Sequence, residues 1–326
     1  MSAISLPKLP AIASSPVAAE VLNGLTAQPK TLSPWLFYDE AGSRLFEEIT
    51  ELPEYYVTRT ERNILAQHAD EMVSAAAGGR DLSIIELGAG TATKTGLLLN
   101  AAIGLQGSVT YYPIDVSATA LEEARTRLEA ELPEVTVEPI VADYTEGMRQ
   151  NSAAHFGRRL VLYIGSSIGN FSPADAVEVL RGVRAQLQPG DGLLLGTDMV
   201  KDPRLLLAAY DDAAGVTARF NMNMLERLNR ELDANFNPQL FRHQARWNEQ
   251  QSRIEMHLES LLSQRVSVSA LDLQVRFKLG ETIHTENSYK FTDQRVVGLL
   301  TRAGFKLRHK WSDEKGWFTV YLAAAS

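Results

Sequence analysis

The stretch IELGAGTATKT at residues 85–95 joins an apolar run to a glycine-rich loop and then to threonines and a lysine. The residues LSIIE, which lead into it, form a short apolar run typical of a buried parallel strand, and ATKTGLLLNAA predicts a helix. A strand, a loop with Gly88 and Gly90, and a helix allow the backbone to approach a bound ligand closely. The dinucleotide-binding fingerprint has a third glycine where this chain has Thr93. The glycines alone therefore do not identify the ligand.

Strand-like and helical stretches alternate from about residue 61 to residue 200. The predicted strands are LSIIELGAG, SVTYYPIDVS, VTVEPIVADYTE, RRLVLYIGSSIGNFSP and DGLLLGTDMV, and the predicted helices are TERNILAQHADEMVSAAA, ATKTGLLLNAA, ATALEEARTRLEAEL and ADAVEVLRGVRAQL. This alternation predicts an α/β fold with a doubly wound, Rossmann-like parallel sheet. Ligands of such sheets bind at the carboxyl ends of the strands.

The pattern changes after about residue 200. RLLLAAYDDAAGVTARFNMNMLERLNREL is mostly helical, whereas RIEMHLES, RVSVSALDLQVRFKLG and ETIHTENSYKFT alternate polar and apolar residues as antiparallel strands do. The last segment returns to helix, strand, loop and strand. We therefore expect a sheet domain over residues 61–199, completed by residues 290–326, and a smaller α+β substrate lobe formed by residues 1–60 and an insertion at 200–289.

Composition argues against several classes of protein. A formal net charge of -8 and the lack of a basic stripe argue against a nucleic-acid partner. The chain has no cysteine, and its six histidines show no ligand spacing such as HExxH, so we expect no metal. No run reaches the roughly 18 apolar residues of a membrane helix, and the N-terminal apolar stretch is too short for a signal peptide. We expect a cytoplasmic monomer with a frayed start.

Acidic residues at the predicted strand ends bear on the ligand. Glu86 precedes the glycines, Asp115 ends the next strand, and Asp143 with Tyr144 ends the third. An acidic residue at the end of the second strand, as Asp115 is here, can bind ribose hydroxyls in both NAD and S-adenosylmethionine sites. We find no hydride-transfer partner, and Asp143 and Tyr144 suit an adenine, so we favour S-adenosylmethionine. A tight turn with no ligand is the structural alternative for the glycines.

Several stretches together resemble the histidine-specific N,N,N-trimethyltransferases of ergothioneine biosynthesis. They are LFYDEAGSRLFEEITELPEYYVTRTE, ELGAGTATKT, PIDVS, VADY, GSSIGNFSP, GTDMVKD, AYDDAAGVTARFN and TENSYKF, and the resemblance runs from about residue 24 to the C-terminus. It implies a methyltransferase lobe, a substrate lobe, S-adenosylmethionine as methyl donor and the α-amino nitrogen of L-histidine as acceptor, with hercynine as product. We assign seven residues to the donor site: Glu86, Gly88, Gly90, Lys94, Asp115, Asp143 and Tyr144.

The resemblance also implies roles on the histidine side. Asn170 and Tyr210 would hold the carboxylate with Tyr55 nearby, and Glu286 and Ser288 would address the two imidazole nitrogens. Gly165, Ser167 and Met256 complete the predicted substrate site, and Tyr38, Phe46 and Phe220 are further candidate walls. From the residues alone, Asn170 can also be a turn former, the tyrosines can also be core residues, and Glu286 and Ser288 can also belong to an exposed polar strand face.

Two other functions stay open at this point. One is a methyltransferase for another amine, such as a tryptophan derivative, although Glu286 and Ser288 do not suit an apolar ring. The other is a non-catalytic binding protein with the same fold, since fold alone does not fix function. In "GSSIGN" this chain has Ser167 where relatives often carry Thr, and Tyr144 where some carry Phe. Both changes keep the relevant chemical groups.

Overall fold

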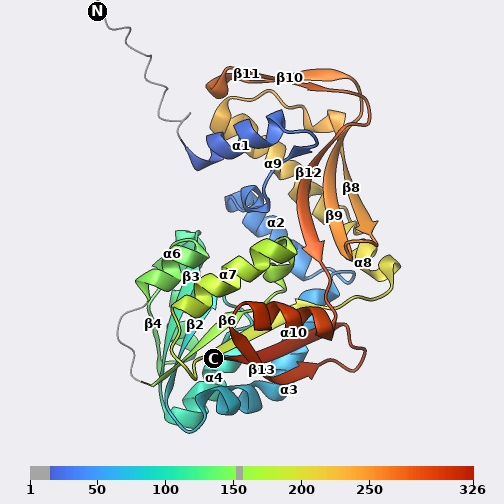
Figure 1. Ribbon diagram of the computed structural model, residues 1–326. Coiled ribbons are helices and arrows are strands. Elements are labelled where there is room, and N and C mark those ends of the chain that lie inside the picture. Colours follow the sequence, from blue (N-terminus) through green and yellow to red (C-terminus); the bar gives the residue numbers. More distant parts are fainter. Residues whose placement is uncertain (1–14, 152–156) are drawn as a thin grey trace, which may run out of the picture. The chain divides into compact units, whose positions relative to one another are not determined.

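The computed structural model of the protein describes residues 15–151 and 157–326 (Figure 1). Of the N-terminal stretch expected to be frayed, residues 1–14 lie outside the described residues, whereas a helix begins at Pro16. Contacts between Cα atoms divide the chain into two units. The first takes Met1–Tyr56 and Asp202–Ser288, and the second takes Val57–Lys201 and Tyr289–Ser326. We call them the inserted unit and the sheet unit.

The sheet unit is built on an eight-stranded sheet with the order β13-β14-β7-β6-β2-β3-β4, in which β5 also pairs with β3. Its strands are β2 (Leu82–Leu87), β3 (Val109–Asp115), β4 (Val135–Val137), β5 (Ile140–Val141), β6 (Arg158–Tyr163), β7 (Gly192–Asp198), β13 (Phe305–Ser312) and β14 (Phe318–Ala325). The pairs among β2 to β7 are parallel, whereas β14 runs antiparallel to both β7 and β13. The α/β fold with a doubly wound sheet is confirmed, with one reversed strand near its edge.

Helices cover both faces of this sheet. They are α3 (Tyr56–Ala77), α4 (Gly96–Gln106), α5 (Ala118–Glu131), α6 (Tyr144–Gln150), α7 (Pro173–Ala185) and α10 (Asp293–Arg302). Apolar residues of α7 and α10 form one core with β2, β6, β7 and β14, and Figure 1 shows these two helices on the same face. On the other face, α3 packs over Gly192 and Gly196 of β7. Every residue of β2 and β7 is buried, as expected for strands covered on both sides.

The third predicted strand differs from the prediction. VTVEPIVADYTE forms two short strands, β4 and β5, because Pro139 has no N–H to donate to a ladder. Asp143 does not end a strand but caps helix α6, where its side chain accepts hydrogen bonds from the N–H groups of Thr145 and Glu146. Helix α4 also begins later than predicted, because Ala92 has a positive φ of 52° in the loop.

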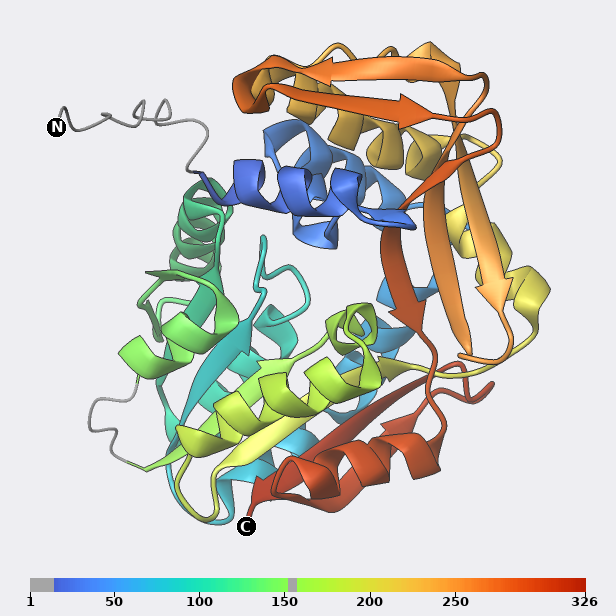
Figure 2. The same cartoon turned by 45° about the horizontal axis from the view of Figure 1, so that its top comes forward.

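The inserted unit has its own sheets. A four-stranded sheet has the order β1-β12-β9-β8, and β10 and β11 form a separate hairpin. The strands are β1 (Lys30–Thr31), β8 (Phe241–Asn248), β9 (Arg253–Ser260), β10 (Gln264–Val268), β11 (Leu273–Phe277) and β12 (Thr282–Tyr289). The helices are α1 (Pro16–Thr26), α2 (Glu40–Thr50), α8 (Pro203–Tyr210) and α9 (Val216–Leu232), with 3-10 turns η2 (Pro34–Phe37), η4 (Pro238–Leu240) and η5 (Ser269–Leu271). Figure 2 shows the β10–β11 hairpin beside α9.

The stretch predicted to be mostly helical after residue 200 forms two helices, α8 and α9. The chain turns at residues 211–215, where Gly215 has a φ of 70°. The carboxylate of Asp212 accepts hydrogen bonds from the N–H groups of Val216 and Thr217, at 2.9 and 2.8 Å, and so caps α9. This break ends α8 at Tyr210, one of the predicted site residues.

Candidate active site

The glycine loop after β2 is tied to the end of β3. The N–H of Gly90 donates to Asp115 Oδ2 at 3.0 Å, and the N–H of Ser117 donates to Asp115 Oδ1 at 2.9 Å. Gly88 and Gly90 have φ values of 70° and 51°, which favour glycine. A Cβ on Gly90 would meet no atom within 4 Å, so open space lies beside this backbone. Each oxygen of the half-buried Asp115 carboxylate keeps room for a further donor.

Glu86 is buried beneath the same loop, with 3% of its surface exposed. Its Oε2 accepts hydrogen bonds from the hydroxyl of Thr95, at 2.6 Å, and from the hydroxyl of Tyr111. Burial raises the pKa of this carboxyl to about 7, although the two hydrogen bonds and the nearby Lys94 ammonium act in the opposite direction. Glu86 therefore holds the strand end, the loop and the start of α4 together.

A buried carboxylate on α3, that of Glu61, joins Lys94 to Gly165. Glu61 has no exposed surface, and it forms an ion pair with the Lys94 ammonium. Both of its oxygens accept from the N–H of Gly165, at 2.9 and 3.0 Å. The glycine loop and the loop after β6 therefore share one acidic partner. We did not predict Glu61, although its spacing from Val57, Ile64 and Leu65 places it on the apolar face of a helix.

Asp143 and Tyr144 lie next to each other at the start of α6 but point to different surroundings. Asp143 is exposed, and its Oδ1 accepts the two capping N–H groups. The Tyr144 ring packs edge-on against Tyr163, with 5.4 Å between ring centroids, and a Cβ on Gly88 would lie 2.9 Å from its hydroxyl. Burial, and then the charge of Asp115, raise the pKa of Tyr144 to about 12. The Tyr144 side chain therefore lies against the glycine loop.

The loop after β6 carries Gly165, Ser167 and Asn170. Gly165 and Ser166 both have left-handed backbone conformations, with φ values of 77° and 60°, and residues Ser167–Asn170 form a 3-10 turn. Gly169 has no room for a side chain, because a Cβ would lie 2.8 Å from the carbonyl oxygen of Tyr289. Asn170 is half-exposed, and within the described residues its amide makes no hydrogen bond. The turn therefore presents an amide that is open to a ligand.

A buried group of charges supports this loop from β7. Asp198 pairs with Lys290 at 2.8 Å and also with Lys201, and its N–H donates to the hydroxyl of Ser166 at 2.9 Å. Burial opposes ionisation of Asp198, but the two ammonium groups lower its pKa overall. Burial lowers the pKa of Lys201 to about 8. These bonds fix the loop between Gly165 and Asn170 relative to β7.

In the inserted unit, three predicted site residues lie together. The hydroxyl of Tyr210 lies 2.7 Å from the Ser288 hydroxyl, and the rings of Tyr55 and Tyr210 meet edge-on with 6.3 Å between centroids. Both tyrosines are more than nine-tenths buried. Tyr55 also contacts Phe46, at 6.3 Å between ring centroids. The hydroxyl groups at the end of α8 and the end of β12 are thus in hydrogen-bond contact, and aromatic rings surround them.

Further aromatic rings extend this setting. Phe220 lies 6.0 Å from Phe46 and 5.8 Å from Tyr38, measured between ring centroids. Met256 is buried on β9, and its carbonyl oxygen accepts from Thr285 at 3.1 Å. Glu286 is half-buried on β12, two residues before Ser288, and its carbonyl oxygen receives a hydrogen bond from His284 at 2.9 Å.

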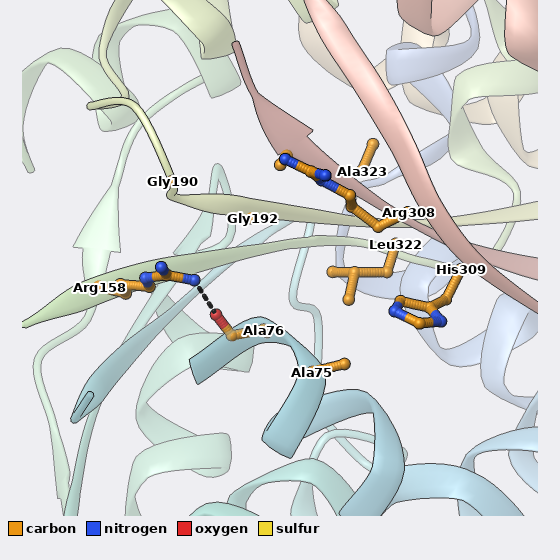
Figure 3. A pocket seen from close by; sticks show the side chains of 10 residues that line it. Ala75, Ala76, Arg158, Gly190, Gly192, Arg308, His309, Leu322 and Ala323 are labelled. Carbon is orange, nitrogen blue, oxygen red and sulfur yellow. Dashed lines mark hydrogen bonds between the residues drawn. The ribbon is translucent and has the colours of Figure 1, made fainter. Parts of the chain in front are cut away.

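Whereas the glycine loop, Asp115 and Gly165 lie at or just after the carboxyl ends of β2, β3 and β6, a separate pocket lies at the amino ends of β6 and β7 (Figure 3). There Arg158 donates to the carbonyl oxygen of Ala76 at 3.3 Å, near the end of α3, and the exposed residues Arg308 and His309 complete the lining. Among residues 15–151 and 157–326, no group of three His, Cys, Asp or Glu side chains is arranged to hold a metal ion. In the same ranges, no helix is long and apolar enough to cross a bilayer.

Comparison with known families assigns the chain. A model of the S-adenosylmethionine-dependent histidine-specific methyltransferases matches residues 17–325. The chain belongs to this family. The resemblance noted in the sequence is therefore confirmed, the chain is an N-methyltransferase, and S-adenosylmethionine is its methyl donor.

Three relatives show how the similarity is distributed. The chain is 46% identical to a histidine N-alpha-methyltransferase of Mycolicibacterium smegmatis, over 95% of each chain. It is 44% identical to a histidine N-alpha-methyltransferase of Mycobacterium tuberculosis, over 94% of each chain. It is 26% identical to an L-tryptophan methyltransferase of Psilocybe serbica, over 97% of this chain and 95% of that one.

Proposed function

We propose that the protein transfers three methyl groups in turn from S-adenosylmethionine to the α-amino nitrogen of L-histidine, with hercynine as product, in ergothioneine biosynthesis. The observation that carries this proposal is the family match over residues 17–325 together with 46% identity to a histidine N-alpha-methyltransferase. The contact between the Tyr210 and Ser288 hydroxyls supports it, because it brings together two residues that the family resemblance assigns to histidine binding.

We assign donor binding to residues of the sheet unit. Asp115 suits the ribose hydroxyls, since its half-buried oxygens each hold only one N–H. Gly88 and Gly90 allow close approach of the backbone, and the space beside Gly90 fits this role. We keep Asp143 and Tyr144 for the adenine, and Glu86 and Lys94 for shaping the loop.

We assign substrate binding to eight residues. Asn170 offers a carbonyl oxygen and two N–H groups, which suit the ammonium and carboxylate ends of an amino acid. Tyr55 and Tyr210 are proposed to contact the carboxylate end, and Gly165, Ser167 and Met256 are also proposed to bind the substrate. Glu286 and Ser288 are proposed to bind the imidazole, because a carboxylate accepts from one ring nitrogen and a hydroxyl can pair with the other.

The chemistry requires orientation more than acid or base groups. When bound, S-adenosylmethionine would supply a methyl group on a positive sulfonium to a neutral amine in line with it, and S-adenosylhomocysteine would leave. The nitrogen must lose one proton to solvent before each of the three transfers, so three protons are released in all. The role of Asn170, Tyr55 and Tyr210 is to hold the amine in that direction and to exclude water. Asn170 must also tolerate an amine that gains methyl groups, so its bonds to the amine cannot be obligatory for every N–H.

A panel of amino acids tests the proposal. Purified protein, donor and equal concentrations of histidine, tryptophan and phenylalanine would be compared by the initial rate of donor consumption. We expect a strong preference for histidine, since buried polar groups reject rings that cannot complete their hydrogen bonds. Preference for tryptophan would favour a methyltransferase for another amino acid, the activity for which the Psilocybe serbica relative is named. Binding of donor without transfer to any amino acid in the panel would contradict the proposal.

The monomeric state, the cytoplasmic location and the independence from metal and nucleic acid are proposals of the same kind. The net charge of -8 supports independence from nucleic acid, and the lack of cysteine supports the cytoplasmic location and the metal independence. The monomeric state does not follow from composition. Light scattering of the purified protein would test the monomer, and activity after dialysis against a chelator would test the metal independence.

A further inference from the structure

Asn221, in the first half of α9, is a polar residue with no exposed surface, and its side-chain amide has three hydrogen-bond partners. Its Nδ2 lies 2.9 Å from Nδ1 of His243 and 3.1 Å from the carbonyl oxygen of His257. Its Oδ1 lies 2.9 Å from the Thr285 hydroxyl. The amide thereby bridges β8, β9 and β12 from the helix that packs against them.

The chemistry of these partners fixes the direction of each bond. The carbonyl oxygen of His257 only accepts, so the amide group that faces it must be the NH2. The same NH2 therefore donates to Nδ1 of His243, which must be unprotonated. Nε2 of His243 then carries the proton and donates to the carbonyl oxygen of Tyr210 at 2.8 Å. Burial lowers the pKa of His243, in agreement with a neutral ring.

The series of hydrogen bonds through Asn221 ends at two elements that are proposed to bind histidine. On one side it holds the backbone of Tyr210, whose hydroxyl lies 2.7 Å from Ser288. On the other it holds Thr285, the residue immediately before Glu286 on β12. All of these residues belong to the inserted unit. Tyr210 and the strand that carries Glu286 and Ser288 are therefore held by one shared amide.

We propose that Asn221, His243 and Thr285 are positioning residues for histidine binding. They act through Tyr210 and β12 and contact neither substrate in this account, so the inference rests on the proposed function. Loss of one buried hydrogen bond in this series would let β12 or Tyr210 shift, and would weaken histidine binding while leaving donor binding unchanged.

Two substitutions at Thr285 separate hydrogen bonding from packing. Thr285→Val keeps the shape but removes the hydroxyl, whereas Thr285→Ser keeps the hydroxyl but removes a methyl group. We expect Thr285→Val to raise the histidine KM about tenfold, the equivalent of about 1.4 kcal/mol, with a much smaller change in kcat and the same donor Kd. Thr285→Ser should stay close to the wild type. The reverse order, with Ser worse than Val, would show that Thr285 acts by packing and would overturn the proposal.

A second pair of variants covers the case in which Thr285→Val does not fold. His243→Gln keeps an N–H that can reach the Tyr210 carbonyl, and His243→Leu does not; the Leu variant should show the higher histidine KM, and equal values would contradict the proposal. Asn229→Ala is the matched control on α9, because Asn229 makes two bonds to the backbone of Phe236, each 2.8 Å, at the far end of the helix. It should lower the melting temperature without changing the histidine KM.

The failure of this inference is distinct from failure of the proposed function. A wild-type protein that does not methylate histidine would contradict the proposed function itself. A wild-type protein that does methylate it, with Thr285→Ser worse than Thr285→Val, would contradict only the positioning role.

Discussion

Asp115 is the residue on which donor binding most depends in this account. Replacing it with Ala removes the acceptor proposed for the ribose and also frees the N–H groups of Gly90 and Ser117. We expect the donor Kd to weaken by about 1–3 kcal/mol, measured by calorimetry. Asp115→Asn, which keeps one acceptor oxygen, should lose less. An unchanged donor Kd in Asp115→Ala would show that this residue does not face the donor.

Glu86 predicts a pH dependence of stability. Burial raises its pKa from 4.5 to about 7, so the folded protein retains a proton that the unfolded chain loses between these values. The contribution of Glu86 to the free energy of unfolding is fully present below about pH 4.5 and is lost as the pH rises through about 7. Wild-type stability should therefore fall over this window by an extra amount on the order of 3 kcal/mol relative to Glu86→Gln. Urea unfolding at several pH values would measure it, and parallel curves for the two proteins would contradict it.

Among single residues, the sequence identifies candidate site residues at strand ends better than those on helices. Asp115 and Glu86 could be selected because strand ends follow from the apolar runs before them. Glu61 could be found only as a charge on the apolar face of α3, which is a weak signal. Its partners, Lys94 and Gly165, are 33 and 104 residues away in sequence, and such long-range pairing is not visible in a single chain.

The packing of α3 on β7 depends on a glycine. A Cβ on Gly196 would lie 2.2 Å from Oε1 of Glu61, so Gly196→Ala must displace the carboxylate or the helix. We expect a loss of about 1–3 kcal/mol in the free energy of unfolding, together with weaker donor binding, because Lys94 and Gly165 share that carboxylate.

The matched control is Gly182→Ala on α7, where a Cβ would meet nothing within 4 Å. There the free energy of unfolding should rise by about 0.5–1 kcal/mol, as for an ordinary Gly to Ala change within a helix. If Gly196→Ala behaved like this control, the close fit between α3 and β7 would be refuted.

Elements with a regular pattern were predictable, and those set by single residues were not. β2, β3, β6 and β7 follow from apolar runs that end near Gly or Asp. Helix α6 was missed, although Asp143 followed three residues later by Glu146 is a capping pattern. Strand β8 was also missed, because FRHQARWN has too few apolar residues to mark a strand, and its pairing with β9 is what defines it.

For the whole molecule, alternation of strands and helices was enough to predict the α/β sheet, because parallel strands need crossover helices. The reversed direction of β14 was not predicted. The direction of this strand depends on how the loop between β13 and β14 turns the chain, and not on the amino-acid composition of the strand. The functional class came from the combination of strand-end acids with the LPEYY, GSSIGN and TENSYK stretches, and the family match confirms it. The individual site residues remain predictions that the experiments above address.

Trimethylation of L-histidine is the reaction that we propose for this protein. Mass spectrometry of the products formed from L-histidine and excess S-adenosylmethionine, sampled over time, would follow each methyl transfer. We predict that mono- and dimethylated histidine appear first and are consumed, that trimethylated histidine accumulates, and that phenylalanine gives little product. A reaction that stops at one methyl group, or equal use of phenylalanine by the unmodified protein, would contradict the account.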